Sequence, residues 1–181
     1  MFETQRLILR NFKEEDLKDF YELTSNKKIG SMSGLIYLTD INSAKVLLKD
    51  FTNKQHLFAI VLKNINKVVG LIELMDYDEK SYKGIDIVEG TKEIAFLLNE
   101  SYWGKGIMQE AMKVVLQWAF QELEITKILS GNYEENIQIA KFQEKIGFKK
   151  IGEIDCLRVV ENKKTKFIQR EINKEEYLKL L

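Results

Sequence analysis

Residues 93–131 most constrain the fold, because they place a long amphipathic helix between two short strand-like runs. The first run is Glu93-Ile-Ala-Phe-Leu-Leu98 and the second is Lys127–Gly131. A strand, a crossover helix and a second strand of the same sheet require the two strands to be parallel. The helix over 106–122 has one apolar side and one side rich in Gln and Lys, so we expect it to cover a face of that sheet.

The rest of the chain alternates strand-like and helix-like patterns without a linker or repeat, which predicts one domain over residues 1–181. Asp40 is placed as the N-cap of one helix, and Gly147 as the stop of another. The predicted strands are 4–10, 57–62, 68–75, 93–98, 127–131, 148–154 and one within 165–172; the predicted helices are 14–25, 41–51, 106–122 and 136–146. This order predicts an α/β protein with a mixed sheet and helices packed on it.

Composition excludes several classes of function. The 28 basic and 28 acidic residues give zero net charge, which argues against a nucleic-acid partner. The lone Cys156 excludes an intrachain disulfide and a multi-Cys zinc site, and the lone His56 excludes an HExxH metal motif, so we expect no metal. The first residues contain no apolar signal-peptide core and no run approaches a membrane span. We therefore expect a cytoplasmic protein; its excess of Lys over Arg favours a bacterial source.

The segment Gly104-Lys105-Gly106 carries the chemistry of the chain, because it joins a strand to the long helix. Glycines let successive amides converge, and a helix N-terminus adds partial positive charge, which suits a phosphate. A GxGxxG motif would need Gly at Gln109. A Walker A motif would need Gly five residues before Gly106, where Ser101 stands. The alternative interpretation is a tight turn that allows close helix packing.

Five ordered segments then carry a family resemblance. They are Glu3-Thr-Gln-Arg-Leu-Ile-Leu-Arg10, Val68-Val-Gly-Leu-Ile72, Glu93-Ile-Ala-Phe96, Tyr102-Trp-Gly-Lys-Gly106, and Asn136 followed by Glu144-Lys-Ile-Gly-Phe148. The set resembles the GNAT N-acetyltransferases, and within them the ribosomal-protein N-terminal (Rim-type) subgroup. The resemblance implies the GNAT acyl-CoA N-acyltransferase fold, a central mixed, mostly antiparallel sheet with a splayed fourth strand flanked by helices.

The resemblance also implies acetyl-CoA as the acetyl donor. In that family the pantetheine arm bonds to the end of the fourth strand, and the pyrophosphate is bound by amides of the turn. The implied cofactor-binding residues are Phe96, Leu97, Leu98, Trp103, Gly104, Lys105, Gly106, Ile107, Met108, Asn136 and Lys141. Alternatives stay open: Asn136 is also a helix N-cap, Trp103 a packing residue, and Lys105 a solvated cation.

Three positions depart from the family pattern. Ser101 stands where the broader family often has Gln or Arg, Ile139 where the Rim-type pattern has Ser, and Gln143 where other branches have a Tyr that protonates the thiolate. Neither usual acid is present. Since a free thiol has a pKa of about 8.5, we expect the leaving thiolate to need no dedicated acid.

Amide formation requires a neutral amine, so a carboxylate base is expected. Glu93 is the first candidate, because the Rim-type pattern also has Glu at that place. Glu73 is the second; it lies in a strand resembling that of spermidine acetyltransferases, where it would equally hold a cationic substrate. The alternative for both is a solvated carboxylate on a strand face.

The sequence thus predicts an acetyl-CoA-dependent N-acetyltransferase acting on a primary amine, such as a protein N-terminus. A polyamine- or antibiotic-modifying enzyme and a catalytically degenerate acyl-CoA sensor are the alternatives, and a homodimer stays open. Residues 26–40 and 76–90 are the expected acceptor loops, and the second is acidic, which favours a cationic acceptor.

Overall fold

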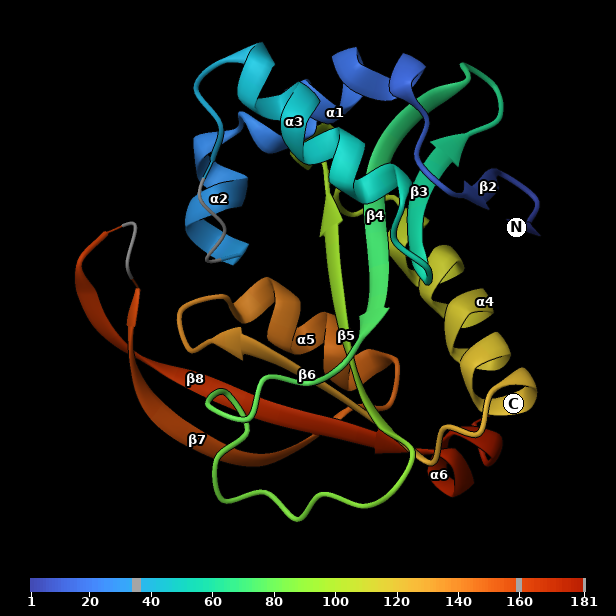
Figure 1. Ribbon diagram of the computed structural model, residues 1–181. Helices are drawn as coiled ribbons and strands as arrows, with labels where there is room; N and C mark the ends of the chain where they lie inside the picture. The colour runs from blue at the N-terminus through green and yellow to red at the C-terminus, as the bar shows by residue number, and fades with distance from the viewer. Residues whose placement is uncertain (34–36, 159–160, 181) are drawn as a thin grey trace. The chain divides into compact units, whose positions relative to one another are not determined.

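The computed structural model (Figure 1) describes residues 1–33, 37–158 and 161–180, and follows the predicted order of elements with additions at both ends and after the first helix. The strands are β1 (Phe2–Glu3), β2 (Leu7–Arg10), β3 (Leu57–Leu62), β4 (Lys67–Met75), β5 (Thr91–Leu98), β6 (Lys127–Tyr133), β7 (Lys149–Arg158) and β8 (Lys163–Asn173). The α-helices are α1 (Leu17–Thr24), α2 (Lys27–Ser33), α3 (Ile41–Thr52), α4 (Ile107–Glu122), α5 (Ile137–Lys145) and α6 (Lys174–Leu178), with 3₁₀ turns η1 (Glu14–Asp16) and η2 (Glu100–Tyr102).

The strands belong to two compact units that share β5. The first unit comprises Met1–Glu73 and Phe96–Val114, and the second comprises Leu74–Ala95 and Val115–Leu181. Strand order is β1-β2-β3-β4-β5 through the first unit and β5-β6-β8-β7 through the second, which makes eight strands among the described residues. The predicted α/β class with a mixed sheet is confirmed, whereas the single domain stays a prediction.

The first unit is built on an antiparallel meander covered by α1 and α3. β2 pairs antiparallel with β3, from Leu7↔Leu62 to Arg10↔Ala59, and β3 pairs antiparallel with β4. Phe20 of α1 is fully buried and makes an edge contact with Phe51 of α3, with ring centroids 5.3 Å apart. Asp40 caps α3 as predicted, accepting a 2.9 Å hydrogen bond from the Ser43 amide.

The second unit contains the parallel strand pair that the sequence predicts. β5 and β6 are parallel, in register from Thr91↔Lys127 to Glu93↔Leu129. β8 lies between β6 and β7 and is antiparallel to both, and β7 and β8 form the long hairpin visible in Figure 1. On α4 the predicted apolar side is buried, while Gln109, Lys113, Gln117 and Gln121 are exposed.

Two short helices, α2 and α6, are absent from the sequence prediction. The sequence predicts a loop over residues 26–40, but Lys27–Ser33 is helical. The helix forms because the Asn26 side chain accepts hydrogen bonds from the amides of Lys28 and Ile29, and because the Ile29 side chain is buried. Residues 34–36 lie outside the described part of the chain. α6 forms because Asn173 caps it and Tyr177 is buried.

The expected first strand over 4–10 also starts too early. The chain turns at Thr4, whose amide donates to the Leu7 carbonyl, so only Leu7–Arg10 is strand, and Phe2–Glu3 folds back on it as β1. Residues 4–6 therefore lie outside the strand ladder.

Candidate active site

The turn between β5 and α4 has the geometry of an anion site. Gly104 and Gly106 both have positive φ, +71° and +73°, a conformation that glycine adopts without steric cost. The first i to i−4 hydrogen bond of α4 runs from the Glu110 amide to the Gly106 carbonyl at 3.0 Å. The amides that precede it have no such acceptor within the helix and carry its partial positive charge.

The turn is also open enough to receive a ligand. A Cβ atom on Gly104 would meet no heavy atom within 4 Å, and Gly104, Lys105 and Gly106 are all exposed. Exposed glycines directly before a helix N-terminus suit a pyrophosphate. The residues present therefore fit the phosphate portion of a nucleotide cofactor.

Trp103 fixes this turn to the end of β5. Its indole N–H donates a 2.8 Å hydrogen bond to the Leu98 carbonyl, and its ring packs against the core of the first unit. Lys28 lies over the ring with Nζ 5.1 Å from the centroid, and Lys105 lies over Tyr102 at 5.3 Å. These contacts give Trp103 the packing role that the sequence left open.

The other predicted cofactor-binding residues of this unit differ in how deeply their side chains are buried. Leu97, Ile107 and Met108 are buried at 7%, 3% and 7% exposure, so their side chains belong to the core and only their backbone is offered to a ligand. Phe96 and Leu98 are half-buried. The backbone after β5 continues beside β4, since the Asn99 amide donates to the Val69 carbonyl at 2.8 Å.

Glu93 lies in the second unit, near the start of β5. Both of its carboxylate oxygens accept a hydrogen bond, Oε1 from the Tyr82 hydroxyl at 3.1 Å and Oε2 from the Asp78 amide at 3.2 Å. Burial raises the pKa of Glu93 above its ordinary value, although these two hydrogen bonds oppose the rise. A half-buried carboxylate with a raised pKa is a stronger base than a solvated one, as proton abstraction requires.

Tyr82 is a candidate site residue that the sequence analysis does not name. Its side chain is 2% exposed, and its ring makes an edge contact with Phe167, with centroids 6.0 Å apart. Burial raises the pKa of the Tyr82 hydroxyl far above its ordinary value, so the group is a hydrogen-bond donor at all working pH values. The only sequence signal was an aromatic residue amid the polar 76–90 segment.

Loop 76–90, which joins β4 to β5, has many exposed side chains, but hydrogen bonds to its backbone anchor it. Gln169 donates from Nε2 to the Ser81 and Lys83 carbonyls at 2.9 and 3.4 Å. Thr126 and Lys127 donate to the Glu89 and Asp86 carbonyls, respectively. The backbone on both sides of Tyr82 is therefore anchored, which keeps the Tyr82 hydroxyl in contact with Glu93.

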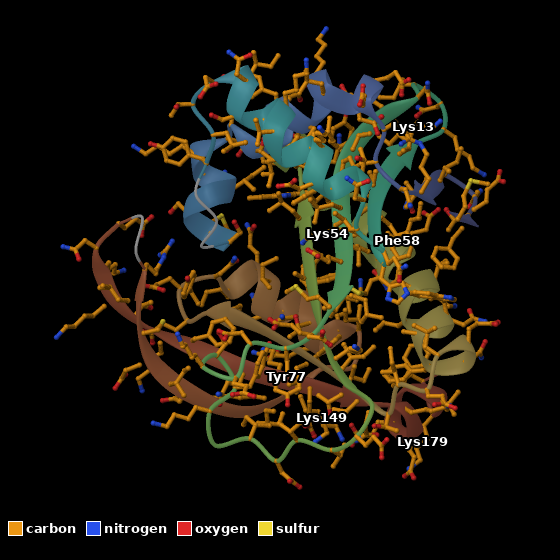
Figure 2. All side chains as sticks on the ribbon, in the orientation of Figure 1. Lys13, Lys54, Phe58, Tyr77, Lys149 and Lys179 are labelled. Atoms are coloured by element: carbon orange, nitrogen blue, oxygen red, sulfur yellow. The ribbon has the colours of Figure 1, made fainter. Side chains whose placement is uncertain are left out.

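Glu73 has a different environment. Its side chain is 14% exposed and its Oε1 lies 2.6 Å from Nζ of Lys54, which is labelled in Figure 2. The partner of Glu73 is therefore a cation, whereas the two hydrogen-bond donors to Glu93 are uncharged. This difference keeps Glu93 as the first candidate for the base.

The helix α5 carries the remaining predicted residues. Asn136 is 7% exposed and caps the helix, accepting from the Ile139 amide at 3.2 Å, which confirms its structural role. Lys141 is exposed. Gln143 is fully buried and donates from Nε2 to the Ser130 hydroxyl at 3.0 Å, while its Oε1 has no hydrogen-bond partner among the described residues. An amide does not titrate, so this position supplies no acid.

The predicted site residues are divided between the units. The first unit holds the turn, the end of β5 and Glu73; the second holds Glu93, Asn136 and Lys141. In the second unit, the Ser130 hydroxyl donates a 3.1 Å hydrogen bond to the Ile94 carbonyl, one residue beyond the last β5–β6 pair, Glu93↔Leu129.

Metal-binding clusters and membrane-spanning helices are both absent from the described residues. No three His, Cys, Asp or Glu side chains of that part come together as a metal site would need. No helix in the described part of the chain is long and apolar enough to cross a membrane.

Comparison with known proteins identifies the family. The family model described as "Acetyltransferase (GNAT) domain" matches residues 6–149. The "Uncharacterized N-acetyltransferase YnaD" of Bacillus subtilis (strain 168) is 26% identical over 149 residues, 82% of each chain. The prophage-derived N-acetyltransferase YokL of the same organism is 28% identical over 150 residues, 83% of this chain and 80% of that protein.

Solved structures share the fold. A GNAT-family acetyltransferase from Bacillus anthracis superposes with a TM-score of 0.82 at 23% identity, covering 96% of this chain and 98% of that one. The spermidine N-acetyltransferase of Vibrio cholerae, in complex with CoA and spermine, superposes with a TM-score of 0.78 at 19% identity, covering 97% and 99%. With the family model spanning most of its length, this chain is an acetyltransferase of the GNAT family.

Proposed function

We propose that the protein transfers the acetyl group of acetyl-CoA to a primary amine, with the β5–α4 turn as the pyrophosphate site. The observation that carries the proposal is the pair of glycines at positive φ directly before the N-terminus of α4. Bound acetyl-CoA supplies an activated thioester, whose C–S bond breaks as the new C–N bond forms. The finer assignment to the Rim-type subgroup makes a peptide N-terminus the first acceptor to test.

Glu93 is the proposed base, acting directly or through water. Primary amines have ordinary pKa values of about 8 to 10 and are largely protonated at neutral pH, so a proton must be removed before attack. Each Glu93 oxygen uses one lone pair on Tyr82 or Asp78, which leaves a second lone pair for the incoming proton. Glu73 stays the second candidate. Its alternative role is to bind a cationic acceptor, as it binds the Lys54 ammonium group in this structure.

No side chain is assigned as an acid. Gln143 and Ile139 cannot donate a proton, and burial raises the pKa of Tyr133, which makes it a weaker acid. The CoA thiol is acidic enough to leave as a thiolate near neutral pH. Asn136 and Lys141 remain proposed cofactor contacts. We place the enzyme in the cytoplasm, where the single thiol of Cys156 stays reduced.

The function is tested by measuring CoA release with a thiol reagent. The acceptors are peptides with free N-termini, polyamines and aminoglycosides, each supplied with acetyl-CoA. Turnover on one class assigns the acceptor and the proposed activity. CoA binding by calorimetry without release above background on any acceptor would instead favour the acyl-CoA sensor. The same preparations, run on a sizing column, show whether the protein is a homodimer.

Tyr82→Phe tests the environment of the base. The Tyr82 hydroxyl stabilises the ionised form of Glu93, so its removal raises the pKa of Glu93 further. Because the carboxylate is the active form, the acidic limb of the kcat/KM–pH profile is expected to move to higher pH. The plateau above the limb is expected to keep its wild-type height.

Tyr77→Phe is the matched control, since Tyr77 lies in the same loop without an assigned role in the site. An acidic limb that Tyr82→Phe leaves in place would show that the group that titrates is not Glu93. The titratable groups that act on the pKa of Glu93 are Asp78 and Tyr82.

A further inference from the structure

Arg6 joins the start of the chain to the turn before α4. Its Nε donates to Oε2 of Glu110 at 2.7 Å, and its Nη1 donates to the Lys105 carbonyl at 2.9 Å. Its backbone amide also donates to Oε1 of Glu110, at 3.0 Å. All of these groups lie in the first unit. Arg6 can reach them because residues 4–6 leave the strand ladder between β1 and β2.

Glu110 in the first turn of α4 keeps Arg6 in place. In addition to Arg6, it accepts a 2.5 Å hydrogen bond from the Thr4 hydroxyl. Burial opposes the ionisation of Glu110, but the hydrogen bonds from Thr4 and Arg6 outweigh it, so the pKa of Glu110 lies below its ordinary value. The carboxylate is therefore charged at neutral pH, and it is also well placed against the helix dipole.

The contact with the Lys105 carbonyl fixes the direction of an amide. In a planar trans peptide the C=O and the following N–H point in opposite directions. With its carbonyl held by Arg6, the peptide between Lys105 and Gly106 must direct the Gly106 N–H away from the Arg6–Glu110 pair. Without that contact, glycines on both sides of Lys105 would let this peptide rotate.

We propose that Arg6 is a positioning residue for cofactor binding: it locks the Lys105–Gly106 peptide so that the Gly106 amide faces the pyrophosphate, and Glu110 locks Arg6. The proposal rests on the proposed function, because it takes the turn as the CoA site.

The role is separable from folding. The Arg6 side chain is 45% exposed and that of Glu110 is 20% exposed. Ion pairs of this kind contribute little to global stability. A neutral variant is therefore expected to fold and to lose order only at the turn.

The test compares Arg6→Met, Arg6→Lys and Glu110→Gln with wild type. Calorimetry gives the CoA affinity, and kinetics give kcat/KM for acetyl-CoA and for acetyl-pantetheine, which lacks the pyrophosphate. Arg6→Met is expected to weaken CoA binding about tenfold or more, the range for a lost hydrogen bond with a charged donor. Its kcat/KM for acetyl-pantetheine is expected to stay at the wild-type value.

Two further variants identify positioning rather than simple attraction. An Arg fork contacts two acceptors at fixed geometry and a Lys ammonium does not, so Arg6→Lys is expected to bind CoA as poorly as Arg6→Met. If Glu110 acts through Arg6, the Arg6→Met/Glu110→Gln double variant binds CoA no worse than Arg6→Met alone. Lys49→Met, which removes an exposed cation of α3 in the same unit, is the charge control.

Several results would overturn the proposal. These are wild-type CoA affinity in Arg6→Met, restored affinity in Arg6→Lys, or equal losses for acetyl-CoA and acetyl-pantetheine. If Arg6→Met does not fold, Glu110→Gln with unchanged CoA affinity has the same force. Failure of the proposed function looks different, because wild-type protein itself would then either not bind CoA or bind it without releasing CoA from acetyl-CoA on any acceptor.

Discussion

Replacing Glu93 with Gln is expected to lower kcat by about 10²–10⁴ at neutral pH, the range typical of a lost general base. Gln keeps the shape of the side chain and can still accept the hydrogen bond from Tyr82, but it cannot take a proton from the amine. Calorimetry should show nearly unchanged CoA affinity, since the turn that is proposed to bind CoA is built from residues after Phe96.

The pH dependence of this loss distinguishes a base from a structural residue. The defect is expected to shrink at high pH, where the amine deprotonates unaided. Glu79→Gln, which neutralises an exposed acid of loop 76–90, is the control and should keep the wild-type rate. A Glu93→Gln enzyme with the wild-type rate at neutral pH would move the role to Glu73 or to solvent.

Gly104→Val and Gly106→Val are each expected to abolish CoA binding. A β-branched residue is strained at the positive φ of both positions. A side chain at position 104 would enter the open space beside the turn, and a Cβ at position 106 would lie 3.5 Å from Nη2 of Arg6, the side chain proposed to hold the turn. Calorimetry with CoA is the measurement. Lys105→Ala, by contrast, is expected to weaken binding by less than about fivefold, because an exposed cation contributes little.

Gly84→Val separates strain from obstruction. Gly84 has a φ of +83° and lies in loop 76–90, and, as at Gly104, a Cβ added there would meet no heavy atom within 4 Å. It should suffer similar backbone strain and keep its CoA affinity. Unchanged affinity in both turn variants would show that the β5–α4 turn does not bind CoA.

The sequence predicts well the parts of this fold that local patterns determine. The apolar run Leu57–Leu62 is a strand with the predicted bounds, and Gly147, at a φ of +104°, ends α5 where expected. Both features are determined by residues that are adjacent in the sequence, so a local pattern is enough to predict them. The short helices α2 and α6 escaped prediction, because each is held by an Asn cap and one buried side chain rather than by a long periodic pattern.

In the candidate site, too, local sequence patterns predict some residues, while others depend on contacts between distant parts of the chain. The turn residues follow from a Gly-x-Gly pattern between a strand and a helix, and Glu93 from its place in a motif. Tyr82 and Arg6 act through contacts with residues 11 and 104 positions away. Spacing of that kind has no periodicity, so only the three-dimensional structure brings these two residues into contact with the candidate site.

The anchoring of loop 76–90 suggests how such an enzyme diverges. Gln169 passes beside Gly152, where a Cβ would lie 2.3 Å from its Oε1, to hold the carbonyls on either side of Tyr82. An insertion or deletion in this stretch would shift Tyr82 off Glu93 and damage the proposed base together with the acceptor surface. Exposed side chains such as Glu79, Lys80 and Lys83 can be exchanged without that penalty. New acceptor preferences in this lineage should therefore arise by point substitution at constant loop length.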